Sequence, residues 1–303
     1  MKKNLVFPKI HKKLKQRNKE IITAFKTKHK ESLAYLKKKG IDLSRATSVS
    51  AQTLALGVAT STLLMSSPVI AKNLPSTLAH VKELPSAAQI LKEALPKILP
   101  EDYQHLSKEE ETTIEAIVKN NLGVDAKVEL AGYRLNKNWG LIGAEQHLLM
   151  FPGDNLTNHL TGLGERLLYS SSGIAPHRGA WGYFSTSKAA LTAADITREK
   201  YYVAVPTFLS PNWNLNMQET SKWFKYRKVI IINPNNGYSV VAVVADAGPA
   251  VYTGKTFGGS PEVMHYLGLS TGGRKGGVII LFVDDPADQV PLGPIDKVYV
   301  NFS

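Results

Sequence analysis

Asp246 is the residue of this sequence whose type and position are best suited to chemistry. It follows the apolar run Ser239–Ala245 directly and precedes a glycine-rich stretch that opens with Gly248. A carboxylate at the end of a buried strand can be half buried, and a half-buried carboxylate suits proton transfer. The alternative is a structural role, in which the carboxylate of Asp246 accepts backbone N–H groups and caps a turn.

Two strands and a short helix are needed to position this carboxylate. Ser239–Ala245 and Lys228–Ile232 are β-branched apolar runs separated by the turn cluster 233–237, so they predict a β-hairpin. Ser260 is a typical N-cap residue, since proline occupies the next position and glutamate the one after it. This pattern predicts a helix that ends at Leu267, before a glycine.

Four short motifs follow the predicted strand in a fixed order: Asp246-Ala247-Gly248-Pro249, Gly254-Lys255, Ser260 and Leu267-Gly268. Their order and spacing resemble the double-psi β-barrel of the rare lipoprotein A-like lytic transglycosylases and of the related three-aspartate domain superfamily. In that family the strand is followed by Asp-Arg-Gly-Pro, a Gly-Arg pair, Asp-Leu-Ser and a short helix ending in Leu-Gly. The resemblance therefore predicts a double-psi β-barrel.

Two upstream segments extend the resemblance. Gly179–Tyr183 is similar to the family's opening aromatic strand, and Tyr202–Pro206 is similar to the strand that leads into the three-aspartate domain. The sequence departs from the family at Gly258, where the family has its second aspartate, and at Pro206, where the three-aspartate relatives have one. Asp246 is the acidic residue of the set that this chain keeps.

The resemblance implies an enzyme that cleaves the glycan strands of peptidoglycan. In lytic transglycosylases one acidic residue protonates the glycosidic oxygen and then accepts the proton of the sugar's own C6 hydroxyl as it attacks C1, which leaves a 1,6-anhydro end. Asp246 would take this general acid and base role. The substrate-binding candidates are Gly248, which would allow close approach of the glycan, Trp181 and Tyr252, whose rings would face sugar rings, and Ser260.

Other classes of function fit the same residues. A barrel without catalysis would bind glycan strands or other envelope components, with Asp246 holding a loop, and a structural envelope protein would need no ligand. We expect no cofactor and no metal. The sequence has no cysteine and no HExxH motif, and the spacing of His147, His159 and His177 does not match a metal-binding pattern.

The acidic pair Asp284-Asp285 closes another apolar run and precedes a proline. This arrangement is typical of a solvated turn. We therefore expect neither carboxylate to approach Asp246 across the mouth of the barrel.

The net charge of the chain is confined to its N-terminus. The 303 residues carry a formal charge of +12, and residues 1–45 contain 15 Lys and Arg against 3 Asp and Glu, which leaves 22 against 22 in the rest. The folded body is therefore neutral. Because the basic block also lacks interleaved aromatic residues, nucleic acid is not an expected partner.

Residues 46–71 form an uncharged stretch after the basic block. An apolar centre at Leu54–Met65 and a small-residue exit at Ala71 are typical of an export signal with a long basic region before it. An uncleaved signal-anchor is the alternative, because the stretch is long enough to cross a bilayer. In both cases the rest of the protein lies in the cell envelope or is secreted. Its expected partner is peptidoglycan or another envelope glycan. If the segment is not cleaved, the membrane is a partner as well.

The sequence thus predicts three regions. Residues 1–71 are the basic and export or anchor segment, residues 72–123 a helical lead-in with a capping box at Ser107–Glu110, and residues 124–303 the barrel with insertions. The lead-in either packs against the barrel or lifts it off the membrane. We predict a mainly β fold, a six-stranded double-psi β-barrel preceded by a short helical region. The strand-like runs are Lys127–Leu135, Tyr201–Pro206, Lys228–Ile232, Ser239–Ala245, Gly277–Val283 and Lys297–Phe302.

Overall fold

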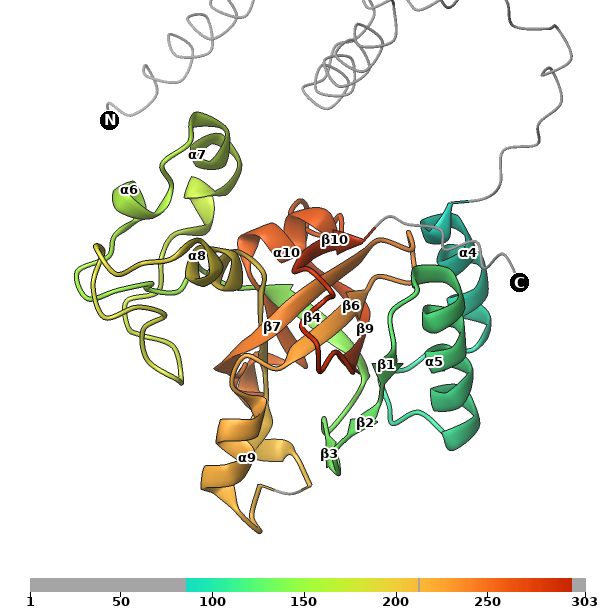
Figure 1. Cartoon of the computed structure of the whole chain (residues 1–303). Coiled ribbons are helices and arrows are strands. Elements are labelled where there is room, and N and C mark those ends of the chain that lie inside the picture. Colours follow the sequence, from blue (N-terminus) through green and yellow to red (C-terminus); the bar gives the residue numbers. More distant parts are fainter. Residues whose placement is uncertain (1–85, 212, 296–303) are drawn as a thin grey trace, which may run out of the picture. The chain divides into compact units, whose positions relative to one another are not determined.

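Six strands close into a β-barrel at the centre of the described structure (Figure 1). The computed structural model describes residues 86–211 and 213–295. All of these belong to the second of two compact units, Glu83–Ser303. Around the barrel the strands are β4 (Trp139–Ala144), β8 (Phe257–Gly259), β5 (Tyr202–Val205), β7 (Ser239–Ala247), β6 (Lys228–Ile232) and β9 (Lys275–Val283).

The barrel mixes parallel and antiparallel pairs. β4 runs parallel to β8 and β5 parallel to β7, whereas the pairs β8–β5, β7–β6, β6–β9 and β9–β4 are antiparallel. This closed, mixed arrangement of six strands is compatible with a double-psi barrel. At its rim β1 (Ala126–Lys127) pairs with β9 and β10 (Gly293–Ile295) with β7, while β2 (Glu129–Leu130) and β3 (Tyr133–Arg134) form a separate ribbon.

Strands β6, β7 and β9 are buried on both faces, which explains their unbroken apolar sequences. In β7, Val240, Ala242 and Val244 belong to the cluster that fills the barrel, because alternate side chains point to the same face. Val241 packs in a second cluster and Val243 in a third, both outside the barrel. A strand of this kind has no solvent-facing side that would require polar residues.

Two helices precede the barrel in the described part of the chain. α4 (Ala87–Ala94) continues into a 3-10 turn, Leu95–Lys97. α5 (Lys108–Leu122) begins at the predicted capping box, which is confirmed: Ser107 Oγ accepts the Glu110 N–H, and the Glu110 carboxylate accepts the Ser107 N–H. Each cap satisfies a backbone donor that the first helical turn leaves unpaired.

These two helices cover one side of the barrel (Figure 1). Leu91 of α4 and Ile114 and Val118 of α5 are fully buried. They pack in one cluster with Ile230 of β6 and Ile279 of β9. The helical region therefore stabilises the outer face of the same strands whose inner face fills the barrel.

Two insertions carry most of the other helices. The first, residues 145–201, joins β4 to β5, and the second, residues 206–227, joins β5 to β6. Leu148 of the first insertion packs with Tyr202 and Ala245 on the outer face of β5 and β7. The insertions contain α6 (Leu156–His159), α7 (Leu163–Tyr169), α8 (Ala193–Lys200) and α9 (Met217–Phe224), with 3-10 turns at Ser170–Ser172 and Thr207–Leu209. A 3-10 turn, Val251–Thr253, lies between β7 and β8, and α10 (Pro261–Tyr266) follows β8.

The predicted hairpin and the predicted helix after Ser260 are confirmed. β6 and β7 pair antiparallel, with Ile232 opposite Ser239 across the turn. α10 begins after Ser260, whose Oγ accepts the Val263 N–H, and Leu267 is its C-cap. Both predictions rest on local signals, a turn between two apolar runs and a cap before a proline.

Two predicted strands are wrong. Gly179–Tyr183 is a turn with an isolated bridge between Gly179 and Gly182, and the barrel strand upstream of β5 is β4 instead. The run Lys127–Leu135 is broken into β1, β2 and β3, because Ala131 and Gly132 both have positive φ (52° and 78°) and form the turn between β2 and β3.

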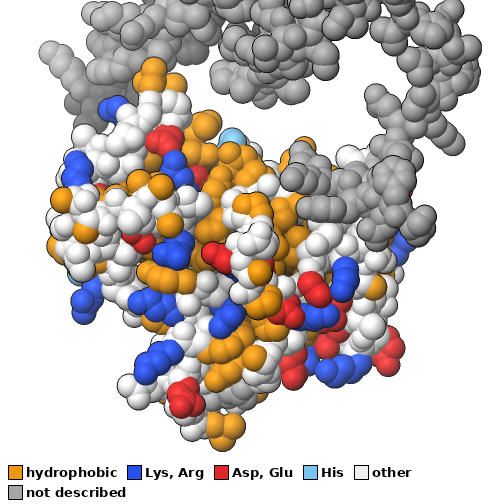
Figure 2. Space-filling view, in the orientation of Figure 1, with side chains coloured by type: hydrophobic (Ala, Val, Ile, Leu, Met, Phe, Trp, Pro, Cys, Tyr) orange, Lys and Arg blue, Asp and Glu red, His pale blue; other side chains and the backbone are white. Residues whose placement is uncertain are grey.

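Several predictions fall outside the described residues. They are the export or anchor segment 46–71, the basic block before it and the strand Lys297–Phe302. Among the helices that are described, none combines the length and apolarity needed to cross a membrane. Acidic and basic side chains are interspersed on the face shown in Figure 2, in keeping with the neutral charge of this part of the sequence.

Replacing Ile114 by alanine tests the packing of α5 on the barrel. The variant Ile114→Ala should lower the free energy of unfolding by about 2–5 kcal/mol, because it leaves a cavity between α5 and the barrel. The control Asn120→Ala, on the exposed side of the same helix, should change it by less than about 0.5 kcal/mol. Urea unfolding followed by tryptophan fluorescence measures both, and equal values for the two variants would contradict the packing described above.

Candidate functional site

The carboxylate of Asp246 is half buried near the end of β7. Its Oδ1 accepts two backbone N–H groups, from Ala180 at 2.8 Å and from Ala247 at 2.9 Å. Its Oδ2 makes no hydrogen bond within residues 86–211 and 213–295. The two donors therefore fix the orientation of the carboxylate and leave one oxygen free.

A β-bulge directs Asp246 toward the loop that contains Ala180. In the pairing of β5 with β7, Val203 lies opposite Val244, whereas the next residue, Ala204, lies opposite Asp246. Ala245 is left without a partner on β5, and such an extra residue changes the direction of the side chain that follows it. Asp246 consequently contacts the 145–201 insertion instead of the interior of the barrel.

Trp181 anchors this loop. Its Nε1 donates a hydrogen bond of 3.0 Å to Ser221 Oγ on α9, and its ring packs against the cluster that fills the barrel. The loop between Gly179 and Gly182 is closed by the Gly182 N–H, which donates to the Gly179 carbonyl at 2.9 Å. Trp181 is half buried, so its ring fixes the loop beside Asp246 and presents only part of its face to solvent.

The other candidates from the sequence have different environments. Gly248 is half buried, its N–H donates to the Val205 carbonyl at 3.1 Å, and the space that a Cβ would occupy there is open. Tyr252 is 92% exposed. Ser260 is fully buried, and its hydroxyl donates to the Lys200 carbonyl at 2.6 Å while capping α10. The structure thus brings Asp246, Gly248 and the Trp181 loop together, whereas Ser260 serves the packing of α10.

A second carboxylate, Glu145, is close to the position where the resembling family has an aspartate. A Cβ added to Gly258 would lie 2.5 Å from Glu145 Cγ, so the Glu145 side chain fills the space that a side chain at 258 would take. The Glu145 carboxylate accepts a hydrogen bond of 2.9 Å from Lys255 Nζ. The signal in the sequence is its position at the end of a strand: Glu145 directly follows Trp139–Ala144, much as Asp246 lies at the end of β7.

The Tyr202 phenol connects this region to a cluster of buried ionisable groups. Burial raises the pKa of Tyr202 well above its ordinary value, and the negative charges of Glu199, Glu145, Asp246 and Glu262 raise it further. All four carboxylates are thus near enough to act on one buried ring.

The buried cluster lies between the first insertion and α10, and it contains two histidines. His159 is held between two carboxylates, with Nδ1 3.0 Å from Asp154 Oδ2 and Nε2 2.8 Å from Glu199 Oε2. His147 Nδ1 lies 3.5 Å from Glu199 Oε1 and 3.8 Å from Glu262 Oε2. The two imidazole centroids are 4.6 Å apart.

The ionisation of this cluster follows from burial and from these contacts. Burial opposes a charge on His159, but the carboxylates of Asp154 and Glu199 outweigh it and raise its pKa to about 10. Burial likewise opposes ionisation of Glu199, but His147 and His159 outweigh it and lower its pKa to about 2. For Glu262, burial and the nearby charge of Glu199 both act in the same direction and raise its pKa to about 8.

The sequence spacing of the histidines did not predict this cluster. His147 and His159 are brought together with Glu199, and one ligand atom of each lies within 4.8 Å of the others. His177 is exposed and is not part of the group. The fold, through the insertion and α8, supplies the proximity that a linear motif does not show.

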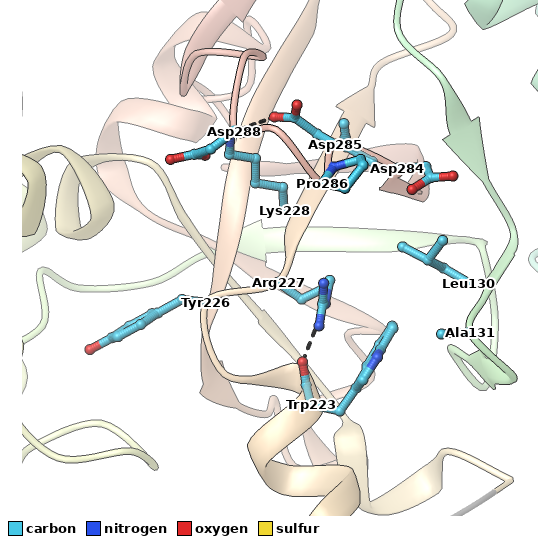
Figure 3. A pocket seen from close by; sticks show the side chains of 11 residues that line it. Leu130, Ala131, Trp223, Tyr226, Arg227, Lys228, Asp284, Asp285, Pro286 and Asp288 are labelled. Carbon is cyan, nitrogen blue, oxygen red and sulfur yellow. Dashed lines mark hydrogen bonds and ion pairs between the residues drawn. The ribbon is translucent and has the colours of Figure 1, made fainter.

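A pocket of about 380 Å³ lies at the start of β6, beside the end of β9 (Figure 3). Lys228 makes ion pairs with Asp285, at 2.7 Å, and with Asp288. Arg227 lies over the Trp223 ring, with its guanidinium carbon 4.4 Å from the ring centroid. No hydrogen bond or ion pair in the described residues joins Asp285 to Asp246, because Lys228 and the loop after β9 engage its carboxylate.

No family model matches this sequence, and no curated protein matches it either. The class of protein is therefore the one that the structure itself defines. It is a closed, mixed six-stranded β-barrel with a half-buried carboxylate oriented at the end of one strand.

Adding a methyl group at position 258 tests the placement of Glu145. Gly258→Ala should lower the free energy of unfolding by about 1–3 kcal/mol, because the new Cβ displaces Glu145. The double variant Glu145→Ala with Gly258→Ala should recover most of that loss, and Gly248→Ala, at an open position, should cost less than about 0.5 kcal/mol. A double-mutant cycle by urea unfolding measures the coupling, and independent effects of the two substitutions would show that the side chains do not meet.

The pH dependence of stability tests the ion pair in the pocket. Burial opposes ionisation of Asp285, but Lys228 and the Val290 and Gln289 N–H groups outweigh it and hold its pKa below its ordinary value of 3.8. A lowered pKa contributes stability that is present above about pH 4 and is lost as the pH falls through the folded-state pKa.

Asp285→Asn should therefore lower the free energy of unfolding by about 1–3 kcal/mol at pH 7, and its difference from the wild type should shrink below about pH 4. Asp284→Asn, at the exposed neighbour, serves as the control. Denaturant unfolding at several pH values measures this difference in the free energy of unfolding. A difference that stays constant down to pH 2 would refute the stabilising ion pair of Asp285 with Lys228.

Proposed function

We propose that this protein is an exported cell-envelope protein whose barrel cleaves peptidoglycan glycan strands as a lytic transglycosylase, with Asp246 as the single general acid and base. The observation that carries the proposal is the geometry of Asp246. Two N–H donors fix Oδ1, and Oδ2 is left free in a half-buried position. The resemblance of residues 240–268 to the rare lipoprotein A-like double-psi barrel supports the choice of substrate.

The arrangement assigns a distinct role to each oxygen of Asp246. Because Oδ1 already accepts two N–H groups, the proton of the neutral acid resides on Oδ2. Oδ2–H donates this proton to the glycosidic oxygen as the bond from that oxygen to C1 breaks. Oδ2 then accepts the proton of the C6 hydroxyl while the oxygen of that hydroxyl bonds to C1. This step closes the 1,6-anhydro ring without consuming water.

The surroundings of Asp246 are suited to a large polar substrate. Gly248 has open space where a side chain would be, so a sugar can approach the backbone there. Tyr252 lies on the 3-10 turn that follows and is exposed, so its ring is available to stack on a sugar face. The Trp181 side chain fixes the loop that orients the carboxylate.

Location in the envelope is proposed from the sequence alone. The basic block before residue 46, the uncharged stretch 46–71 and the small-residue exit at Ala71 together favour export. An enzyme that acts on peptidoglycan must reach the outer side of the cytoplasmic membrane. Cleaved and uncleaved forms of the segment both satisfy this requirement.

A second candidate is a barrel that binds glycan without cleaving it. One observation favours it: the Ala180 N–H bond to Asp246 ties the insertion loop to β7, which is the structural role that a turn-capping aspartate would have. Under this alternative Asp246 holds the loop, and binding depends on the surface around Gly248 and Tyr252.

Incubation with purified peptidoglycan distinguishes the two candidates. The wild type should release 1,6-anhydro-muropeptides, detected by mass spectrometry. Asp246→Asn should reduce their formation by at least about 100-fold, since the amide cannot act as a general acid and base, while its oxygen can still accept the Ala180 and Ala247 N–H groups.

Asp284→Asn is the matched control, because the same chemical change is made at an exposed carboxylate outside the site. It should leave the product yield unchanged. Product formation by Asp246→Asn at the wild-type rate would remove Asp246 from catalysis. Absence of product from the wild type, together with retention on insoluble peptidoglycan in a pull-down, would establish the binding function instead.

A further inference from the structure

Four segments of the chain bring buried ionisable side chains together where the first insertion meets α10. His147 follows β4, His159 ends α6, Glu199 lies on α8, and Glu262 lies on α10. Their side chains are 0%, 3%, 1% and 5% exposed. Ionisable groups are rarely this deeply buried unless a partner compensates them.

Two members of this group lack the partners that buried polar groups normally have. Both ring nitrogens of His147 are without a hydrogen bond, and so are both carboxylate oxygens of Glu262. Buried polar atoms in native proteins are nearly always paired, and each exception needs an explanation such as a bound ion. Here the unpaired atoms belong to two side chains that face each other, with His147 Nδ1 3.8 Å from Glu262 Oε2.

The ligand atoms lie close enough together to surround a small metal ion. Zinc bonds nitrogen and oxygen ligands at about 2.0–2.2 Å, which places tetrahedral ligand atoms about 3.3–3.6 Å apart. The distance of 3.5 Å from His147 Nδ1 to Glu199 Oε1 falls in this range, whereas the 2.8 Å from His159 Nε2 to Glu199 Oε2 is a hydrogen bond that must lengthen when an ion enters. One atom each from His147, His159 and Glu199 falls within a group 4.8 Å across.

A supporting shell is already in place around His159 and Glu199. The Nδ1 of His159 faces Asp154 Oδ2 at 3.0 Å, which is the carboxylate contact that orients most metal-binding imidazoles. Asp154 itself accepts the Met150 and Asn155 N–H groups. Glu199 Oε1 accepts the Leu148 N–H at 2.9 Å. These bonds direct the Nε2 of His159 toward Glu199, whose other carboxylate oxygen faces His147.

We propose that these four side chains bind one divalent transition-metal ion, for which zinc is the best match, in a closed structural site. Two carboxylates neutralise a dication, and two imidazoles favour zinc over magnesium or calcium. The side chains are almost fully buried and number four, as in structural zinc sites. On binding, His159 Nε2 releases its proton, and the ion replaces its hydrogen bond to Glu199.

The ion would fasten the 145–201 insertion to the barrel. His147, His159 and Glu199 belong to the insertion, whereas Glu262 belongs to α10, which follows barrel strand β8. The same insertion carries Ala180, whose N–H orients Asp246. This inference goes beyond the proposed function and holds whether or not the barrel cleaves glycan.

The metal content of the wild-type chain is the primary test. The full chain, purified without a histidine tag, should contain about one zinc ion by inductively coupled plasma mass spectrometry. Removal of zinc by a chelator should lower the thermal unfolding midpoint, and added zinc should restore it. Isothermal titration of the stripped protein with zinc chloride should saturate near one ion per chain, whereas magnesium chloride should give no comparable binding.

Three variants assign the site. His147→Ala should abolish tight zinc binding, and Glu262→Gln, which keeps the shape of the side chain, should weaken it at least about tenfold. His177→Ala, at an exposed histidine outside the cluster, should bind zinc as the wild type does.

The proposal is overturned if the wild type holds no zinc, either as purified or after reloading, since that result does not depend on whether any variant folds. It is also overturned if magnesium binds more tightly than zinc. Zinc affinity equal to that of the wild type in both Glu262→Gln and His147→Ala would likewise contradict the proposal, because the ion would then be bound elsewhere.

Discussion

The parallel pairing of β5 with β7 is the interaction on which the rest of the structure depends. β5 has four residues, Tyr202–Val205, all buried, and it lies between β8 and β7 in the barrel. Without it the sheet would be open between β8 and β7. Both insertions begin or end at this strand, so the pairing also fixes where the helices of the insertions leave the barrel.

The irregularity in this pairing gives Asp246 its position. The shift between Val203 and Ala204 leaves Ala245 unmatched and directs Asp246 to the insertion loop. Before the start of β5, α8 ends at Lys200, one residue after Glu199. The buried histidine cluster therefore contacts the chain just before β5, whereas Asp246 pairs with Ala204 within it, and both Glu199 and Asp246 contribute to the raised pKa of Tyr202 between them.

Sequence reasoning succeeded where the signal is local. The apolar runs of β6 and β7 with a turn between them, the cap at Ser260 and the capping box at Ser107 each require only neighbouring residues, and the structure contains all of them. β4 and β8 were missed because glycines, including Gly258, interrupt their patterns. Those glycines are needed there because other side chains, such as that of Glu145, occupy the space above them.

The environment of the candidate sites could not be predicted in the same way. The 145–201 insertion has no periodic pattern that reports which residues face the barrel, so the convergence of His147, His159 and Glu199 follows only from the tertiary structure. The position of Asp246 at a strand end was predictable, but its two N–H donors were not, because one of them, Ala180, is 66 residues away.

A crystal structure of the protein with a muropeptide glycan fragment is the most direct measurement of the central claim, that Asp246 presents one free oxygen to a substrate. The expected result places Asp246 Oδ2 within about 2.6–3.2 Å of the glycosidic oxygen, while Oδ1 keeps its bonds to the Ala180 and Ala247 N–H groups. A glycan bound on another face, or an Asp246 whose two oxygens both bond only to the protein in the complex, would contradict the claim.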